Sequence, residues 1–170
     1  DSAKNSYNVN LNEVKKKITK KTKAAILTHA AGEPIPEISK IAKYLKKNKI
    51  FLIEDCSQAH GAYPKNNKTK VGNYGDIAAF SMMYRKNIAM GGSGGMVYTK
   101  NKKLHLLGMR HADRGAPVWM KYKLDLRNPG IANFPALNFN TNDLSCATGI
   151  AQLERINFTL QNRKKFINKI

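Results

Sequence analysis

Side chains that can do chemistry follow two apolar stretches of the sequence. The first stretch, residues 50–53, leads into Glu-Asp-Cys-Ser-Gln-Ala-His-Gly at 54–61. The second stretch, residues 77–80, leads into Ser81, and Lys86 follows a few residues later. A lysine amine can bond to a carbonyl carbon, and a nearby carboxylate can hold a proton or a charge. From position alone, a structural ion pair between Asp55 and Lys86 is an equally good interpretation.

The pattern around these stretches predicts a parallel sheet that would bring their ends together. Residues 24–28 and 50–53 are short apolar runs typical of buried strands, and between them apolar residues recur at helical spacing from Ile38 to Leu45. Strand, helix and strand at this spacing form a βαβ unit, whose strands we expect to be covered on both faces. Ligands collect beyond the carboxyl ends of such strands, so Asp55 and Lys86 are expected to converge there.

The remaining elements complete an α/β domain. We expect further strands at 77–81 and 96–99, and glycines 91–95 are expected to let the chain turn tightly beside Lys86. Further helices are expected near 11–18 and 104–109, from an Asn142 N-cap to about 157, and over 158–170. Residues 111–140 are rich in Asn and Pro and are predicted to be an irregular loop.

Composition limits the classes of function. The 170 residues carry 30 Lys plus Arg against 11 Asp plus Glu, a net charge of +19, but the lysines are spread along the chain, which favours a solvated surface over a nucleic-acid interface. No apolar run approaches the roughly 20 residues that a membrane span needs. Cys56 and Cys146 lack the spacing of a zinc site or a disulfide scaffold, no metal is assigned, and a cytoplasmic setting is expected.

Several ordered motifs resemble the DegT/DnrJ/EryC1/StrS family of sugar aminotransferases. These motifs are Ile53-Glu54-Asp55-x-x-Gln58-Ala59-His60-Gly61-Ala62, Val71-Gly72-x-x-Gly75-Asp76-Ile77-x-x-Phe80-Ser81, Lys86-Asn87, Gly94-Gly95-Met96-Val97-x-Thr99, Asn138-Phe139-x-x-Asn142-Asp143-Leu144 and Gln152-Leu153. The resemblance implies the large domain of an aspartate-aminotransferase-like (fold type I) protein, with a mostly parallel sheet flanked by helices. It also implies pyridoxal 5'-phosphate as cofactor. Residues 1–157 would be an incomplete cofactor-binding domain, and 158–170 the start of a connection toward a small domain.

The resemblance also implies roles for five residues. Lys86 would be the lysine that forms a Schiff base with the cofactor, and Asp55 would face the pyridine nitrogen. Gln58 would lie beside the ring, and Ser81 would donate a hydrogen bond to the cofactor phosphate. Asn138 would reach the phosphate in the neighbouring subunit, which implies a homodimer with shared active sites.

The implied reaction moves an amino group from an amino-acid donor, glutamate, to a keto-sugar, which is expected to be nucleotide-linked, in amino-sugar and surface-polysaccharide biosynthesis. Two alternatives stay open: a sugar dehydratase that uses the same cofactor, and a basic polyanion- or nucleic-acid-binding protein that keeps the fold without catalysis. Dehydratases of the family carry a histidine in place of the lysine, so Lys86 favours transamination. The roles of His29, His60, Arg85 and Asn140 are left open; the family usually has an arginine at the last of these.

Overall fold

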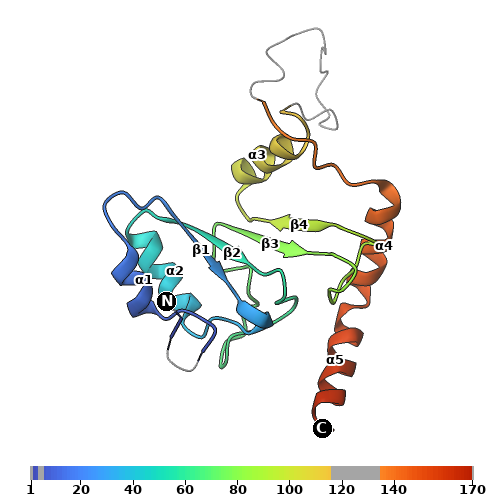
Figure 1. Ribbon diagram of the computed structural model, residues 1–170, viewed down its shortest axis with the longest axis horizontal. Coiled ribbons are helices and arrows are strands. Elements are labelled where there is room, and N and C mark those ends of the chain that lie inside the picture. The colour runs from blue at the N-terminus through green and yellow to red at the C-terminus, as the bar shows by residue number, and fades with distance from the viewer. Residues whose placement is uncertain (1, 4–5, 116–134, 170) are drawn as a thin grey trace.

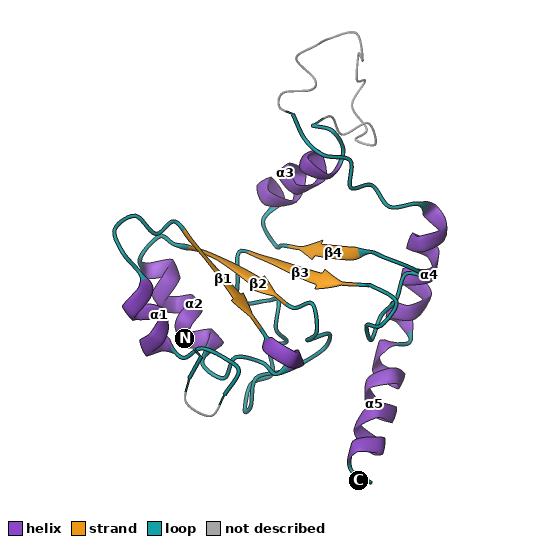
Figure 2. Cartoon of the chain, viewed as in Figure 1, coloured by secondary structure: helices purple, strands orange, loops and turns teal. Residues whose placement is uncertain are grey.

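Helices and strands alternate up to β2 in the computed structural model, which describes residues 2–3, 6–115 and 135–169 (Figures 1 and 2). The elements, in order, are α1 (Leu11–Lys17), β1 (Ala24–Thr28), the short 3-10 helix η1 (Ala30–Gly32), α2 (Ile38–Lys47), β2 (Phe51–Asp55), β3 (Ile77–Ser81), β4 (Gly95–Tyr98), α3 (Lys102–Ala112), α4 (Asp143–Glu154) and α5 (Ile156–Ile167). The predicted α/β class is therefore confirmed.

A single sheet in the order β1-β2-β3-β4 organises the described residues. Strands β1, β2 and β3 run parallel, and β4 returns antiparallel to β3. Thr28 pairs with Asp55, Asp55 pairs with Ala79, and Ser81 pairs with Gly95. The three parallel strands thus end at one edge of the sheet, where the loop between β3 and β4 also begins and ends.

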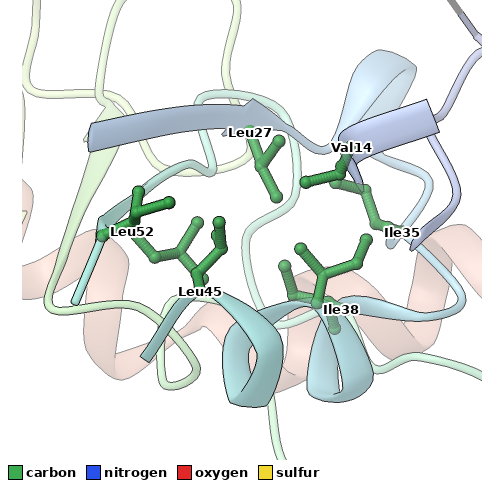
Figure 3. Packing of buried hydrophobic residues seen from close by; sticks show 8 residues of the cluster. Val14, Leu27, Ile35, Ile38, Leu45 and Leu52 are labelled. Carbon is green, nitrogen blue, oxygen red and sulfur yellow. The ribbon is translucent and has the colours of Figure 1, made fainter. Parts of the chain in front are cut away.

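The main hydrophobic core lies between the first two helices and the first two strands. Leu27 of β1 and Leu52 of β2 pack against Val14 of α1 and against Ile38 and Leu45 of α2 (Figure 3). These helices therefore cover one face of β1 and β2. The apolar spacing that predicted α2 is confirmed, since Ile38, Ile41 and Leu45 are all buried.

The expectation that the strands are covered on both faces is wrong for the described residues. Ile26 in β1 is 68% exposed, Phe51 in β2 is 49% exposed and Val97 in β4 is 62% exposed. Successive residues of a strand face opposite sides of a sheet, and the two helices cover only the side that carries Leu27 and Leu52. Within the described residues, the two helices leave the opposite face of β1 and β2 uncovered.

The C-terminal helices match the predicted ones closely. The Asn142 side chain accepts a hydrogen bond from the Ser145 N–H, 2.9 Å, and so caps α4 as expected. Helix α5 follows α4 after Arg155 alone. The predicted loop over 111–140 falls partly on 116–134, which lie outside the described residues, and α3 extends to Ala112. None of the helices described is both long and apolar enough to cross a membrane.

The core predicts a stability difference between two neighbouring residues of α2. Leu45 is fully buried and Lys46 is exposed. Leu45→Ala should lower the free energy of unfolding by about 2–5 kcal/mol because it leaves a cavity, whereas Lys46→Ala should change it by less than about 0.5 kcal/mol. Urea unfolding measures both. Equal losses in the two variants would contradict the assigned core.

Candidate functional site

A buried carboxylate joins the end of β2 to the segment before β3. Glu54 is fully buried. Its Oε1 accepts hydrogen bonds from the N–H groups of Tyr74, 2.8 Å, and Gly75, 2.6 Å. Its Oε2 accepts one from the Gly72 N–H, 2.8 Å, and lies 3.1 Å from His29 Nε2. Every lone-pair direction of the carboxylate is thus used within the fold.

His29 completes this network in one tautomer. Its Nδ1 accepts a hydrogen bond from the Ile35 N–H, 3.0 Å, so the proton of the neutral ring lies on Nε2 and is donated to Glu54. Burial raises the pKa of Glu54, but the hydrogen bonds from His29, Gly72, Gly75 and Tyr74 outweigh burial and hold it below its ordinary value. The structure therefore assigns His29 to packing beneath the sheet edge.

The same histidine and glutamate form a group with Cys56 that resembles a metal site in its residue types. One ligand atom from each of the three lies within 4.8 Å of the others. The His29 and Glu54 atoms already take part in the hydrogen bonds described above. Burial, together with the charges of Glu54 and Asp55, raises the pKa of the Cys56 thiol to about 12, so the thiol stays protonated and binds metal poorly.

Asp55 lies at the same sheet edge but faces the opposite side from Glu54. Its Oδ1 accepts a hydrogen bond from the Ser57 N–H, 2.9 Å, and its Oδ2 accepts one from the Thr28 hydroxyl, 3.3 Å. Burial raises the pKa of Asp55, but these hydrogen bonds, with a smaller contribution from His29, bring it below its ordinary value. The carboxylate is therefore charged at neutral pH. The role implied for Asp55, contact with the protonated pyridine nitrogen of the cofactor, requires this charge.

Lys86 sits in the loop that joins β3 to β4. Hydrogen bonds from the Met82 N–H to the Gly94 carbonyl and from the Tyr84 N–H to the Gly92 carbonyl, both 2.8 Å, hold the two sides of this loop together. Buried Met82, Ile88 and Met90 form a small core beneath it, against which Cys146 of α4 and Ile156 of α5 pack. Gly91 has φ +83°, so the expected tight turn beside the lysine is confirmed there.

Lys86 and Gln58 share one polar cavity. This cavity, of about 350 Å³, is lined by Ala31, Gln58, His60, Arg85, Lys86, Asn87 and Arg163. A larger apolar cavity of about 860 Å³ between β4 and α3 includes none of the five predicted site residues. The smaller cavity, with its amine and amide, is the better candidate for chemistry.

The other predicted site residues lie outside the lining of this cavity. Asp55 and Ser81 end β2 and β3 at the same sheet edge. Asn138 is exposed, and it forms a bridge with Asp113 in the segment that precedes α4. Asn140 donates a hydrogen bond from Nδ2 to Asp113 Oδ1, 2.9 Å, so its side chain has a structural partner there.

His60 lies between the cavity and the core. It is 5% exposed, its ring centroid lies 5.7 Å from that of Phe80, and neither ring nitrogen has a hydrogen-bond partner in the described residues. Burial lowers its pKa, and the charge of Lys86 lowers the pKa further. The ring is therefore neutral at neutral pH.

Sequence reasoning missed two residues of this region. Glu54 was grouped with the other polar residues, although its place two positions after Leu52 puts it on the core face of β2. Arg163 was grouped with the basic C-terminal helix, although it stands at helical spacing from Ile156 and Leu160. A period of two places Glu54 on the core face of β2, and a period of 3.6 places the exposed Arg163 on the helix face that carries Ile156 and Leu160.

Comparison with known proteins identifies the family. The profile of the DegT/DnrJ/EryC1/StrS aminotransferase family matches residues 1–170. The chain belongs to this family. GDP-perosamine synthase of Escherichia coli O157:H7 is 30% identical to this DegT/DnrJ/EryC1/StrS chain over 165 residues, which cover 97% of the chain and 42% of that protein. The chain thus spans about two fifths of the length of the curated relatives that it matches.

Solved structures agree on the fold of this DegT/DnrJ/EryC1/StrS chain. An aminotransferase from Psychrobacter cryohalolentis is 31% identical with a TM-score of 0.75, and the match covers 87% of this chain and 37% of that one. GDP-4-keto-6-deoxy-D-mannose-3-dehydratase of E. coli, solved with bound hydrated PLP, matches with a TM-score of 0.81 at 24% identity, over 97% of this chain and 44% of that one. The aminotransferase-like fold that the resemblance implied is confirmed.

The Glu54 network predicts an acid-dependent stability. Glu54→Gln should lower the free energy of unfolding at neutral pH by about 1–3 kcal/mol, because an amide N–H₂ cannot accept the backbone N–H groups. The folded pKa of Glu54 lies below the ordinary 4.5, so its contribution is complete above that value and is lost as pH falls through the folded pKa. When the pH is lowered from about 5 to about 1, the free energy of unfolding should therefore fall less in Glu54→Gln than in the parent protein.

Glu154→Gln is the matched control for this prediction, because Glu154 is exposed at the end of α4. Urea unfolding at a series of pH values should show its profile parallel to that of the parent protein. A Glu54→Gln profile that also ran parallel to the parent would contradict the assigned network.

Proposed function

We propose that the protein carrying this chain is a pyridoxal-phosphate-dependent aminotransferase that moves an amino group from glutamate to a nucleotide-linked keto-sugar. The observation that carries the proposal is the shared cavity of Lys86 and Gln58 at the sheet edge of a chain that belongs to this family throughout its length. The nucleotide link is supported by the name of the relative GDP-perosamine synthase. The proposed role is in the biosynthesis of amino sugars for surface polysaccharides.

The residues at this edge fit the cofactor chemically. Lys86 offers an amine for the cofactor aldehyde, and Gln58 offers an amide beside it in the same cavity. His60, whose buried ring nitrogens lack partners in the described residues, leaves hydrogen-bonding capacity for a polar ligand. Pyridoxal phosphate, when bound, supplies a ring that takes up the electrons released when a proton leaves the donor carbon.

Each residue has a defined task in this proposal. Lys86 Nζ would hold the cofactor, and the amine, once released, would take up the proton that leaves the donor carbon. Asp55 keeps the pyridine nitrogen protonated, and its lowered pKa supports that task because the carboxylate remains charged. Ser81 donates a hydrogen bond from its hydroxyl to the phosphate.

Asn138 is proposed to act across a homodimer. It lies outside the Lys86 cavity and is exposed between α3 and α4, so it is free to face a second subunit, whose cofactor phosphate it would contact. The domain boundary at 157 is part of the same proposal, with α5 as the start of the connection toward a small domain. Two free cysteines support a cytoplasmic location.

Transamination is preferred over the two alternatives because of Lys86. The dehydratase alternative shares the fold, as the E. coli dehydratase structure does, but a lysine amine suits reversible transfer of nitrogen. The polyanion-binding alternative has only the net charge of +19 in its favour. Membership of an aminotransferase family supports an enzyme instead.

Loss of the lysine should abolish the visible spectrum of the bound cofactor. The protein reconstituted with pyridoxal phosphate should show an absorbance band that Lys86→Ala lacks, because Lys86 provides the one amine among the described residues that line the cavity. Lys100→Ala, at an exposed lysine beyond β4, serves as control and should keep the band. A band that survived in Lys86→Ala, or that was absent from the parent protein, would refute the proposal.

Product analysis should separate transfer from dehydration. Incubation with glutamate and a nucleotide-linked keto-sugar should yield 2-oxoglutarate and an amino-sugar in equal amounts, because the nitrogen moves between the two substrates. Mass spectrometry of the sugar nucleotide measures this. A product that had lost water and gained no nitrogen would support the dehydratase instead.

A further inference from the structure

The cavity that contains Lys86 is also lined by two further cationic side chains, Arg85 and Arg163. The proposed bond between the cofactor and Lys86 does not need these two charges. Arg85 and Lys86 come from the loop between β3 and β4, and Arg163 comes from α5. No carboxylate lines the cavity, and in the described part of the chain none of the three forms an ion pair. Cations gathered without a counter-charge form a binding site for an anion.

Helix α5 brings Arg163, whose side chain is exposed, to the lining of this cavity. Ile156, Leu160 and Arg163 recur at i, i+4 and i+7, so they lie on one face of α5. Ile156 packs on the small core of Met82, Ile88 and Met90 under the Lys86 loop. Figure 2 shows that α5 extends from the end of α4, and that both helices lie on the side toward which β3 points.

Gly61 allows this close approach. A Cβ atom built on Gly61 would lie 2.6 Å from Leu160 Cδ1, and the φ of Gly61 is +72°. A larger residue at position 61 would therefore require the Leu160 side chain of α5 to move and would be strained at this φ. His60, the neighbour of Gly61, adds a second and independent sign of a ligand, because its buried ring lines the same cavity and lacks hydrogen-bond partners in the described residues.

We propose that Arg163 binds an anionic oxygen group of a substrate in the Lys86 cavity. The group is the carboxylate of the amino-acid donor or the diphosphate of the sugar nucleotide, which share the chemistry of planar or clustered anionic oxygens. The guanidinium fork of Arg163 suits two parallel hydrogen bonds to such oxygens. The inference rests on the proposed function and adds a substrate-binding residue from a helix that lies far along the chain from Lys86.

The experiment compares Arg163→Ala, Arg163→Lys and the control Lys164→Ala in the cofactor-loaded protein. Lys164 is exposed on α5 and does not line the cavity. Two measurements distinguish the sources of the anion: the glutamate concentration that half-converts the cofactor spectrum, and the inhibition constant of inorganic pyrophosphate against the sugar nucleotide. Arg163→Ala should raise one of the two by about 10-fold or more, since hydrogen bonds to charged groups are lost.

The possible results test the role of Arg163 independently of the proposed aminotransferase activity. A raised glutamate requirement identifies the donor carboxylate, and a raised pyrophosphate constant identifies the diphosphate; Arg163→Lys should lie between Ala and the parent, because it keeps charge without the fork. Values in Arg163→Ala that match Lys164→Ala, with the cofactor band intact, would overturn the role of Arg163 and leave the aminotransferase assignment standing. A change in cofactor retention alone would also overturn it.

Discussion

The buried carboxylate of Glu54 is the constraint on which the candidate site depends. An ionised carboxylate without partners inside a protein is very costly, and here three backbone N–H groups and the His29 ring supply those partners. The same hydrogen bonds tie residues 72–75 to the end of β2, and β3 starts immediately afterwards at Ile77. The spacing between the ends of β2 and β3, and hence between Asp55 and the loop that carries Lys86, is set by this network.

The two faces of the sheet at this edge thus have different roles: one stabilises the fold, and the other presents a charged carboxylate. On the face of Glu54, side chains are buried and their hydrogen bonds hold the strands in register. On the face of Asp55, the carboxylate stays charged and accessible, held by Thr28 and Ser57. The Lys86 loop is fixed from a third side by Met82, Ile88 and Met90, which pack on α4 and α5. The small apolar core thus supports the loop that carries Lys86, while the cavity beside it is lined mainly by polar side chains.

Helices and strands could be predicted from the sequence where the spacing of apolar residues alone distinguishes a helix from a strand. Ile38, Ile41 and Leu45 specified α2, and the apolar residues 77–80 specified β3, because burial on a helix or in a sheet imposes a fixed spacing. The parallel strands predicted that Asp55 and Lys86 converge at one edge; Asp55 ends β2 at that edge but lies outside the lining of the Lys86 cavity, which Gln58, known only from the resemblance, shares. The presence of Arg163 in this cavity could not be predicted, because no local pattern shows that α5 lies beside the loop between β3 and β4. The exposed face of Ile26 was also missed, because an apolar residue does not show which face of a strand a helix covers.

The most direct test of the central claim is to locate the covalent bond between cofactor and chain. The protein is loaded with pyridoxal phosphate, reduced with borohydride, digested and mapped by mass spectrometry. The account predicts one dominant phosphopyridoxyl adduct, on Lys86, because among the described residues Lys86 is the one lysine that lines the cavity with Gln58. An adduct distributed over the exposed lysines, or concentrated on a lysine other than Lys86, would contradict the account.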